Sequence, residues 1–265
     1  MISYFKKVIK LFLRINNISY FKNISNDKLL NLIKLFHPHD LGYDLIRIGD
    51  NSDGGYLVPN CLDGIKNCFS IGVGNKTSFE NDLFKKGINS FLADYSQDVS
   101  EIPNKFNFEK KNIKSFNSEK SLNINKWIEN KRGIISNENL IFQIDAEGFE
   151  YEIISSILDS NLDQIKILII EFHDLDYSGN KTIYQIIDSA MSKILKKFDV
   201  CHIHANNWKN TILVNKYEFP SNLEVTFLNK KFVKSKSKVK NLPHKLDFKN
   251  VSDKPDIKLE TYWYN

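Results

Sequence analysis

The chain has 265 residues, 42% of them hydrophobic, which is enough to bury one substantial core without division into several large domains. Its net charge of +5 is too small and too evenly spread to indicate a nucleic-acid-binding protein. The cysteines Cys61, Cys68 and Cys201 form no C-x-x-C pair, which argues against a disulfide framework or a zinc site and favours a reducing, cytoplasmic setting.

Residues 1–40 are predicted to form a helical extension. Residues 1–16 alternate apolar and basic side chains at helical spacing, which predicts a helix with a basic face. No apolar run approaches the roughly 20 residues that span a bilayer, and no cleavage site follows, so we expect a soluble protein. Docking of this helix on the body or on a second subunit is favoured over peripheral contact with a membrane surface. Ser25 is expected to cap a second helix that ends near His37.

Residues 41–229 alternate strand-like and helix-like patterns. An entry hairpin is expected first, with strands at 43–48 and 56–58 joined by a Gly-rich turn. Strands are then expected at 68–73, 89–94, 113–116, 140–145, 165–172, 199–204, 211–214 and 223–228, and helices at 78–86, around 127, at 147–158 and at 183–195. Runs that are apolar at every position indicate strands covered on both faces. The pattern predicts the α/β class, with a Rossmann-like, doubly wound, mostly parallel sheet that ends in an antiparallel hairpin. Residues 230–265 are predicted to be a basic C-terminal tail, with a solvated Lys-rich run at 230–240.

A nucleoside-binding signal follows the first buried strand. Gly72 and Gly74 lie just before a helix, where a ligand can approach the main chain closely, and Asp94 closes the next strand 20 residues after Gly74. By itself the glycine pair is more typical of an ordinary strand-to-helix turn, but its position and Asp94 favour a cofactor that contains ribose. The third glycine of a dinucleotide fingerprint is replaced by Thr77, which disfavours a nicotinamide-dependent oxidoreductase. S-adenosyl-L-methionine has a ribose and no phosphate, and therefore fits better.

Several blocks of the sequence resemble the FkbM-type methyltransferases. They are Arg47-Ile48-Gly49, Asp53-Gly54-Gly55-Tyr56-Leu57, Gly72-Val73-Gly74 with Ser78-Phe79-Glu80, Asp145-Ala146-Glu147-Gly148-Phe149-Glu150, Glu171-Phe172-His173 and His202 to Asn207. The resemblance runs from about Arg47 to Thr226, and the block from Asp145 to Glu150 is its most specific part. Ala146 departs from the bulkier aliphatic residue usual in the family. The resemblance implies a class I methyltransferase fold and S-adenosylmethionine-dependent O-methylation, commonly of sugars, glycolipids or related metabolites.

Asp145 is the central residue of the predicted reacting centre. It ends a buried strand next to the strand that carries Gly72, so its carboxylate is expected in the ligand crevice at the strand ends. There it can accept a proton or hold a cation. Glu147 is expected in the first turn of the following helix, where a favourable interaction with the helix dipole is an equal alternative to ligand binding. Glu150 and Glu152 are expected to face solvent. The predicted cofactor-binding residues are Gly72, Gly74, Asp94, Asp145 and Glu147.

Histidines follow the next two strands and are candidates for the catalytic base. His173 comes after the strand at 165–172, and His202 and His204 share one face of a later strand. A single histidine is more often a hydrogen-bonded structural residue, but a set with Asp145 is a stronger candidate. Asp145, His173 and His204 are the predicted catalytic residues. A metal-free acid–base arrangement is favoured over a divalent ion held by these three.

The acceptor is predicted to be a carbohydrate or another small molecule rather than nucleic acid. Tyr43, Tyr56 and Trp208 are expected near the pocket rim, where flat rings suit sugar faces, although packing of the sheet edge explains them equally well. Asn206 and Asn207 either orient the acceptor or form a turn. A non-catalytic glycan-binding protein on the same fold is the remaining alternative.

Overall fold

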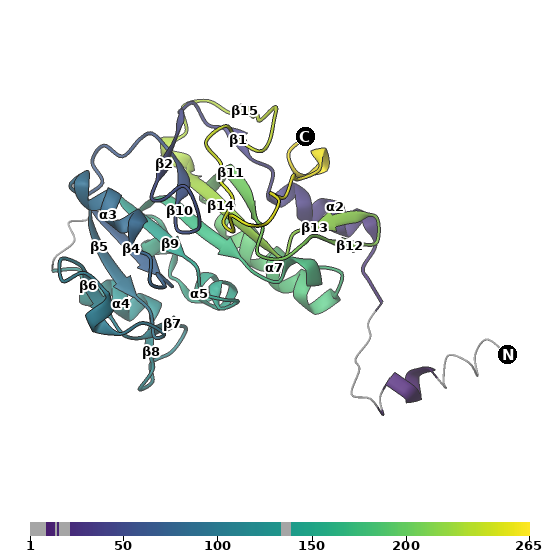
Figure 1. Cartoon of the computed structure of the whole chain (residues 1–265), viewed down its shortest axis with the longest axis horizontal. Coiled ribbons are helices and arrows are strands. Elements are labelled where there is room, and N and C mark those ends of the chain that lie inside the picture. Colours follow the sequence, from purple (N-terminus) through teal and green to yellow (C-terminus); the bar gives the residue numbers. More distant parts are fainter. Residues whose placement is uncertain (1–8, 14, 16–21, 134–138) are drawn as a thin grey trace.

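A seven-stranded sheet forms the centre of the protein (Figure 1). The structure is a computed structural model and describes residues 9–13, 15, 22–133 and 139–265. The strands of the sheet are β4 (Asn67–Ile71), β5 (Asn89–Ala93), β6 (Asn107–Glu109), β9 (Leu140–Ile144), β10 (Ile165–Phe172), β11 (Phe198–Asn206) and β14 (Asn222–Asn229).

The strands lie in the order β6-β5-β4-β9-β10-β14-β11. The run from β6 to β10 is parallel, and β14 is antiparallel to both of its neighbours. Numbered in chain order within the sheet, this is 3-2-1-4-5-7-6. The predicted fold class is confirmed. The order reverses between β4 and β9, and open α/β sheets bind ligands at such a switch point.

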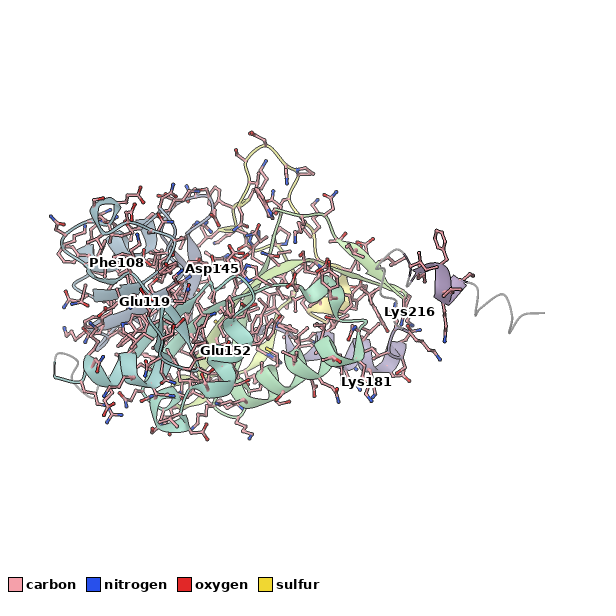
Figure 2. The ribbon with its side chains drawn as sticks, turned by 90° about the horizontal axis from the view of Figure 1, so that it is seen from below. Phe108, Glu119, Asp145, Glu152, Lys181 and Lys216 are labelled. Atoms are coloured by element: carbon pink, nitrogen blue, oxygen red, sulfur yellow. The ribbon has the colours of Figure 1, made fainter. Side chains whose placement is uncertain are left out.

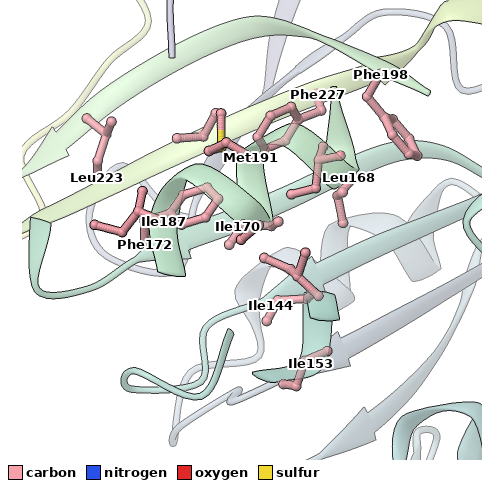
Figure 3. Close-up of a cluster of buried hydrophobic side chains, with 14 of the residues drawn as sticks. Ile144, Ile153, Leu168, Ile170, Phe172, Ile187, Met191, Phe198, Leu223 and Phe227 are labelled. Atoms are coloured by element: carbon pink, nitrogen blue, oxygen red, sulfur yellow. The ribbon is translucent and has the colours of Figure 1, made fainter. Parts of the chain in front are cut away.

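Helices cover one face of the sheet. They are α2 (Asn26–Leu35), α4 (Ile124–Asn130), α5 (Glu150–Ser156) and α7 (Lys181–Ile194), with the short α6 (Asp159–Leu162) next to α5. Figure 3 shows Ile187 and Met191 of α7 packed over Leu168 and Ile170 of β10. Alternate residues of the same strand face the other side of the sheet. This double coverage explains why β4, β9 and β10 are buried at every position and largely apolar.

The opposite face is covered by α3 (Ser78–Lys85) and by the entry hairpin of β2 (Leu45–Ile48) and β3 (Tyr56–Pro59). Thr226 Oγ1 on β14 donates a 2.7 Å hydrogen bond to the carbonyl of Leu57, which attaches the hairpin to the sheet. The expected hairpin is therefore confirmed. Its turn, which contains Asp53, reaches the carboxyl ends of the central strands.

Short elements complete the chain. They are β1 (His39–Asp40) paired with β15 (Ser237–Lys238), β7 (Asn112–Lys114) with β8 (Ser121–Asn123), β12 (Ile212–Val214) with β13 (Tyr217–Phe219), and 3-10 turns at Val99–Glu101, Leu175–Tyr177, Lys230–Phe232 and Thr261–Trp263.

The helix expected at 147–158 begins only at Glu150, because Glu147 and Gly148 have φ of 50° and 94° and cannot start a right-handed helix.

The C-terminal segment, residues 230–265, runs back along the body instead of leaving it (yellow in Figure 1). Trp263 is fully buried and packs edge-on against Phe219, and its ring lies 6.1 Å from that of Phe36 on α2. The lysines of the run at 230–240 are mostly exposed. The segment thus combines a solvated basic stretch with an apolar anchor at its end.

Much of the predicted N-terminal basic helix lies outside the described residues, because residues 1–8, 14 and 16 are not among them. Residues 9–13 and 15 are helical, and the side chains of Ile9, Leu11, Phe12 and Ile15 are exposed. Among the described residues, no helix is long and apolar enough to cross a membrane.

Gly72 follows β4 directly and lies close against the carboxyl end of β9. Its φ is +73°, and a Cβ at this position would lie 1.6 Å from the carbonyl oxygen of Asp145. Asp145 N also donates a 2.9 Å hydrogen bond to Ile71 O. No side chain fits at residue 72 without separating the two strand ends.

Gly72→Ala should therefore lower the free energy of unfolding by at least about 3 kcal/mol. Gly74→Ala is the matched control, because Gly74 has φ +55° and a Cβ there would meet nothing within 4 Å, so only backbone strain of about 1 kcal/mol applies. Urea unfolding of both variants checks this. Equal losses would contradict the close approach of the two strand ends.

Candidate active site

A cavity of about 390 Å³ lies at the carboxyl edge of the central strands. Such a volume is within the range of roughly 300–1,000 Å³ typical of small-molecule sites. Its walls come from the hairpin turn, the loops after β4, β5 and β9, the start of α3 and the region of β7, and they include Asp53, Tyr56, Gly72, Gly74, Lys76, Glu80, Asp94, Tyr95, Lys111, Gln143, Asp145, Glu147 and Phe149. All five predicted cofactor-binding residues lie in this wall.

The loop after β4 is held against the end of β5. Asp94 Oδ2 accepts a 2.9 Å hydrogen bond from Gly74 N, and Oδ1 accepts 2.7 Å bonds from the amide and hydroxyl of Ser96. The carboxylate is thus fixed in orientation at the cavity wall. Since a carboxylate has about four lone-pair positions, Asp94 retains capacity for a ligand hydroxyl.

Asp145, labelled in Figure 2, follows β9 and is partly buried in the cavity wall. Its Oδ1 is buried and has no hydrogen-bond partner among the described residues. Burial, and then the negative charge of Glu171, raise the pKa of this carboxyl well above its usual range. An unpaired, basic carboxylate oxygen beside a cavity is suited to take up a proton or a cation.

His173, directly after β10, lies among four carboxylates. Its Nε2 is 3.6 Å from Asp145 Oδ1, 3.5 Å from Glu147 Oε2 and 3.8 Å from Glu171 Oε1, and its Nδ1 is 3.4 Å from Glu150 Oε1. Burial by itself would lower the pKa of His173, but Glu150, Glu171 and Asp145 outweigh it and raise the pKa to about 9. The structure therefore brings Asp145 and His173 together, as expected.

Glu147 and Glu150 differ from their expected positions. Glu147 lies in a left-handed loop three residues before the helix starts, so the predicted role in its first turn is wrong. Glu150 is fully buried rather than facing solvent, because its carboxylate accepts bonds of 2.8 and 2.7 Å from the amides of Gly148 and His173. Glu150 thereby joins the loop after β9 to the end of β10. Glu152 is partly exposed on α5 and accepts a 2.8 Å bond from Ser115 N.

His204 is not in the cavity wall. Its Nδ1 is 3.3 Å from Glu224 Oε2 and its Nε2 is 3.5 Å from Asp256 Oδ1, and these carboxylates raise its pKa to about 10 against the opposing effect of burial. His202 Nε2 lies 2.8 Å from Asp247. Both histidines thus face the C-terminal segment. A catalytic role for His204 stays a prediction.

The side chains of Asn206 and Asn207 hydrogen-bond to other parts of the protein and have structural roles. Asn206 Nδ2 donates to Glu171 Oε1 at 2.9 Å, and Asn207 Nδ2 donates to three carbonyls of residues 251–255. Glu171 is buried, and burial followed by the charge of Glu224 raises its pKa to about 7. Neither asparagine is in the cavity wall.

Of the three aromatic residues expected at the rim, only Tyr56 lines this cavity. Tyr43 lines a separate hollow of about 420 Å³ beside β1 and β15, and Trp208 is exposed beneath the ammonium of Lys254. Tyr95 and Phe149 line the cavity, where Tyr43 and Trp208 were expected.

A row of buried, hydrogen-bonded polar side chains lies beneath the cavity. The sequence patterns did not identify these residues as a group. Ser70 Oγ contacts both Glu80 Oε1 and Gln143 Oε1, and Gln143 Nε2 donates to Tyr56 Oη at 3.2 Å. One hydroxyl proton cannot serve two acceptors, so a protonated Glu80 donating to Ser70, which then donates to Gln143, satisfies the set. Burial raises the pKa of Glu80 to about 7, consistent with this arrangement.

No family model and no curated protein matches the chain. Among solved structures, it is similar to the fibrillarin pre-rRNA processing protein of Methanococcus jannaschii (10% identity over 72% of this chain and 84% of that one, TM-score 0.39). It is also similar to an S-adenosylmethionine-dependent methyltransferase of Clostridium acetobutylicum (8%, 84% and 98%, TM-score 0.36) and to the N-methyltransferase NodS of Bradyrhizobium japonicum (7%, 63% and 86%, TM-score 0.33). Likenesses at these TM-scores assign neither an activity nor a ligand.

The protonation of Glu80 leads to a test. A carboxyl whose pKa rises from 4.5 to about 7 on folding does not destabilise the folded state below about pH 4.5, where it is protonated in both states. Above that pH the folded state loses stability progressively, and the loss is complete once the pH has risen through 7. Glu80→Gln should therefore gain stability relative to the wild type between pH 5 and pH 8, by up to about 3 kcal/mol. Urea unfolding at the two pH values measures the difference. Glu119→Gln, at an exposed site, should show no such trend (Figure 2).

Proposed function

We propose that the protein is an S-adenosylmethionine-dependent O-methyltransferase of the FkbM type that acts on a carbohydrate hydroxyl. The observation that carries the proposal is the cavity at the switch point of a class I methyltransferase sheet, where Gly74, Asp94 and Asp145 line one space. The sequence blocks that resemble the family supply Gly72, Gly74, Asp145 and Glu147 of this wall.

The charges of the wall favour S-adenosylmethionine over a dinucleotide. Besides the protonated Glu80, four acidic residues line the cavity, Asp53, Asp94, Asp145 and Glu147, against the two lysines Lys76 and Lys111. A pyrophosphate would bring two negative charges into this acidic wall, whereas a sulfonium brings a positive one. When bound, S-adenosylmethionine supplies a methyl group activated by the positive sulfur.

Each residue has a role in this proposal. Asp94 accepts the ribose hydroxyls, and Gly74, which has open space where a side chain would be, lets the ligand approach the main chain. The Asp145–His173 pair lies where the acceptor oxygen attacks the methyl carbon. The unpaired Oδ1 of Asp145 accepts the hydroxyl proton, and the positive charge of His173 keeps the carboxylate oriented. Alignment and proton removal are the chemistry required of the protein.

A sugar acceptor is supported by the mixture of side chains near Asp145. Tyr95 and the exposed ring of Phe149 offer flat apolar faces, and Lys111, Asn112 and Glu147 offer hydrogen-bonding groups at the same cavity. An activated sugar or a glycan under construction presents both kinds of surface. We place this activity in the cytoplasm.

Binding of the cofactor can be measured directly by calorimetry. The wild type should bind S-adenosylmethionine and S-adenosylhomocysteine but not NAD. Asp94→Ala should weaken S-adenosylhomocysteine binding by roughly 5- to 150-fold, since a buried ribose hydroxyl without its acceptor costs about 1–3 kcal/mol. Asp98→Ala, the same change at an exposed aspartate paired with Lys110, is the control and should bind like the wild type. Equal affinity of Asp94→Ala and the control would refute the cofactor assignment.

The acceptor class requires a test in the host. Deletion of the gene should remove a methyl group from a sugar, seen by mass spectrometry of surface glycans and nucleotide sugars. The wild-type gene should restore it, and Asp145→Asn should not. Loss of a methyl group from a peptide, lipid tail or nucleic acid with unchanged glycans would contradict the sugar assignment. Restoration by Asp145→Asn would show that methyl transfer does not need this carboxylate.

A further inference from the structure

Three potential metal ligands meet on the cavity wall. Asp145, Glu147 and His173 each offer one ligand atom, and the three atoms lie within 4.8 Å of one another. Asp145 and Glu147 line the cavity, and His173 Nε2 points toward both of them, at 3.6 and 3.5 Å. The group therefore lies between the end of β9 and the end of β10 and is open to the ligand space on one side.

The polar atoms of this group lack the hydrogen bonds that buried atoms normally have. The side chain of His173 is only 9% exposed, and its Nδ1, which faces Glu150 Oε1 at 3.4 Å on the side of the ring away from the group, has no hydrogen-bond partner among the described residues. Asp145 Oδ1 is likewise buried without a partner. The separations from His173 Nε2 are longer than the 2.7–3.2 Å of an ordinary hydrogen bond. Direct hydrogen bonding thus leaves the group unsatisfied.

A shared ion accounts for these separations. Two ligands about 2.1 Å from one ion are about 3.0 Å apart at a right angle and about 3.4 Å apart at the tetrahedral angle. The observed 3.5 and 3.6 Å are close to the wider of these separations. A second acidic group, Asp53, Glu171 and Glu224, is nearby. Its carboxylates already accept hydrogen bonds from Asn206, Asn222 and Asn250, so it has less need of an ion.

The local backbone holds the three ligands together. Glu147 is in the left-handed region, and Glu150 binds the amides of Gly148 and His173 at once. This bridge fixes the loop that carries Glu147 against the strand end that carries His173. Glu147 itself is 87% exposed, so its carboxylate can adjust to an incoming ion without disturbing the core.

We propose that Asp145, Glu147 and His173 bind one divalent cation of the Mn²⁺ type, which coordinates the acceptor hydroxyl. Two carboxylates and one imidazole form a mixed oxygen and nitrogen set that suits Mn²⁺. Three protein ligands leave open coordination positions, and these face the cavity.

The catalytic role of the ion rests on the proposed function, whereas the binding of the ion to the protein does not depend on that function. In the transfer, the acceptor oxygen forms a bond to the methyl carbon while the carbon–sulfur bond breaks and its electron pair goes to sulfur. The hydroxyl proton passes to water in the cavity. The cation holds the oxygen in line and lowers the pKa of the hydroxyl. Asp145 then acts as a ligand rather than as the proton acceptor.

The test measures metal binding to the full chain without any other ligand. The protein is freed of metal with a chelator and titrated with Mn²⁺, and free Mn²⁺ is followed by electron paramagnetic resonance. We expect one site per chain. Glu147→Gln, which alters an exposed side chain and leaves the core intact, and Asp145→Asn should each weaken binding at least about tenfold.

Two variants serve as controls. Glu152→Gln makes the same charge change on α5, outside the cluster, and should bind Mn²⁺ like the wild type. Glu224→Gln changes the second acidic group. Loss of binding in Glu224→Gln with retention in Asp145→Asn would put the ion in the second group and overturn the proposal. Absence of a stoichiometric site in the wild type would also overturn it and would leave His173 as a protonated partner of the carboxylates.

Failure of this inference is separable from failure of the proposed function. S-adenosylhomocysteine binding is measured by calorimetry on the same metal-free protein. Binding of S-adenosylhomocysteine without a Mn²⁺ site refutes the cation and leaves the methyltransferase proposal intact. A Mn²⁺ site without S-adenosylhomocysteine binding supports the cation and refutes the methyltransferase proposal.

Discussion

The contact between the ends of β4 and β9 is the constraint on which the site depends. Gly72 lies so close to the carbonyl of Asp145 that residue 72 can carry no side chain. Strand order reverses at this point, so the chain leaves β4 toward α3 on one face and leaves β9 toward α5 on the other. The separation of these two loops opens the cavity, while the glycine keeps the strand ends in contact beneath it. Asp94 after β5 and Asp145 after β9, the strands on either side of β4, are consequently presented to one space.

Burial of charge is the second theme of this region. Glu150, Glu171 and His173 are buried and Asp145 is partly buried beside them, and ionised groups in such places require partners. Glu150 obtains two backbone amides, and Glu171 obtains two asparagine side chains. Asp145 and His173 are left with long, imperfect contacts to one another. The groups that lack good partners are those that border the cavity, a distribution typical of sites that bind or react with a ligand.

The C-terminal segment packs against polar side chains of β11 and β14, next to the candidate site. Asn250 donates to Glu224 at 2.6 Å, Asp247 and Asp256 face His202 and His204, and Asn207 holds the main chain of residues 251–255. The last strands of the sheet would otherwise expose two histidines and a glutamate at their ends. The segment thus completes the polar layer next to the candidate site without entering the cavity.

The sequence by itself determined the fold class and most of the elements. A continuous apolar run such as 167–170 within Ile165–Phe172 indicates a strand covered on both faces, and the spacing of apolar residues in 183–195 fits only a helix. It also indicated Gly72, Gly74, Asp94 and Asp145, because loops at the carboxyl ends of parallel strands converge whatever their side chains. It did not determine the insertion of β14 between β10 and β11, which depends on pairing between strands distant along the chain.

Tertiary structure alone decided the partners of the polar side chains. Glu150 and Glu152 are two residues apart and chemically alike, yet one is buried on two amides and the other lies at the surface with Ser115. The left-handed loop at Glu147 and Gly148 delays the helix to Glu150 and so changes which side chain turns inward. His204 was directed to Glu224 and Asp256 by a C-terminal segment whose own composition is that of a solvated chain. Local periodicity indicates which face a residue occupies, but the partner that meets it there comes from a distant part of the chain, so only the folded arrangement could decide it.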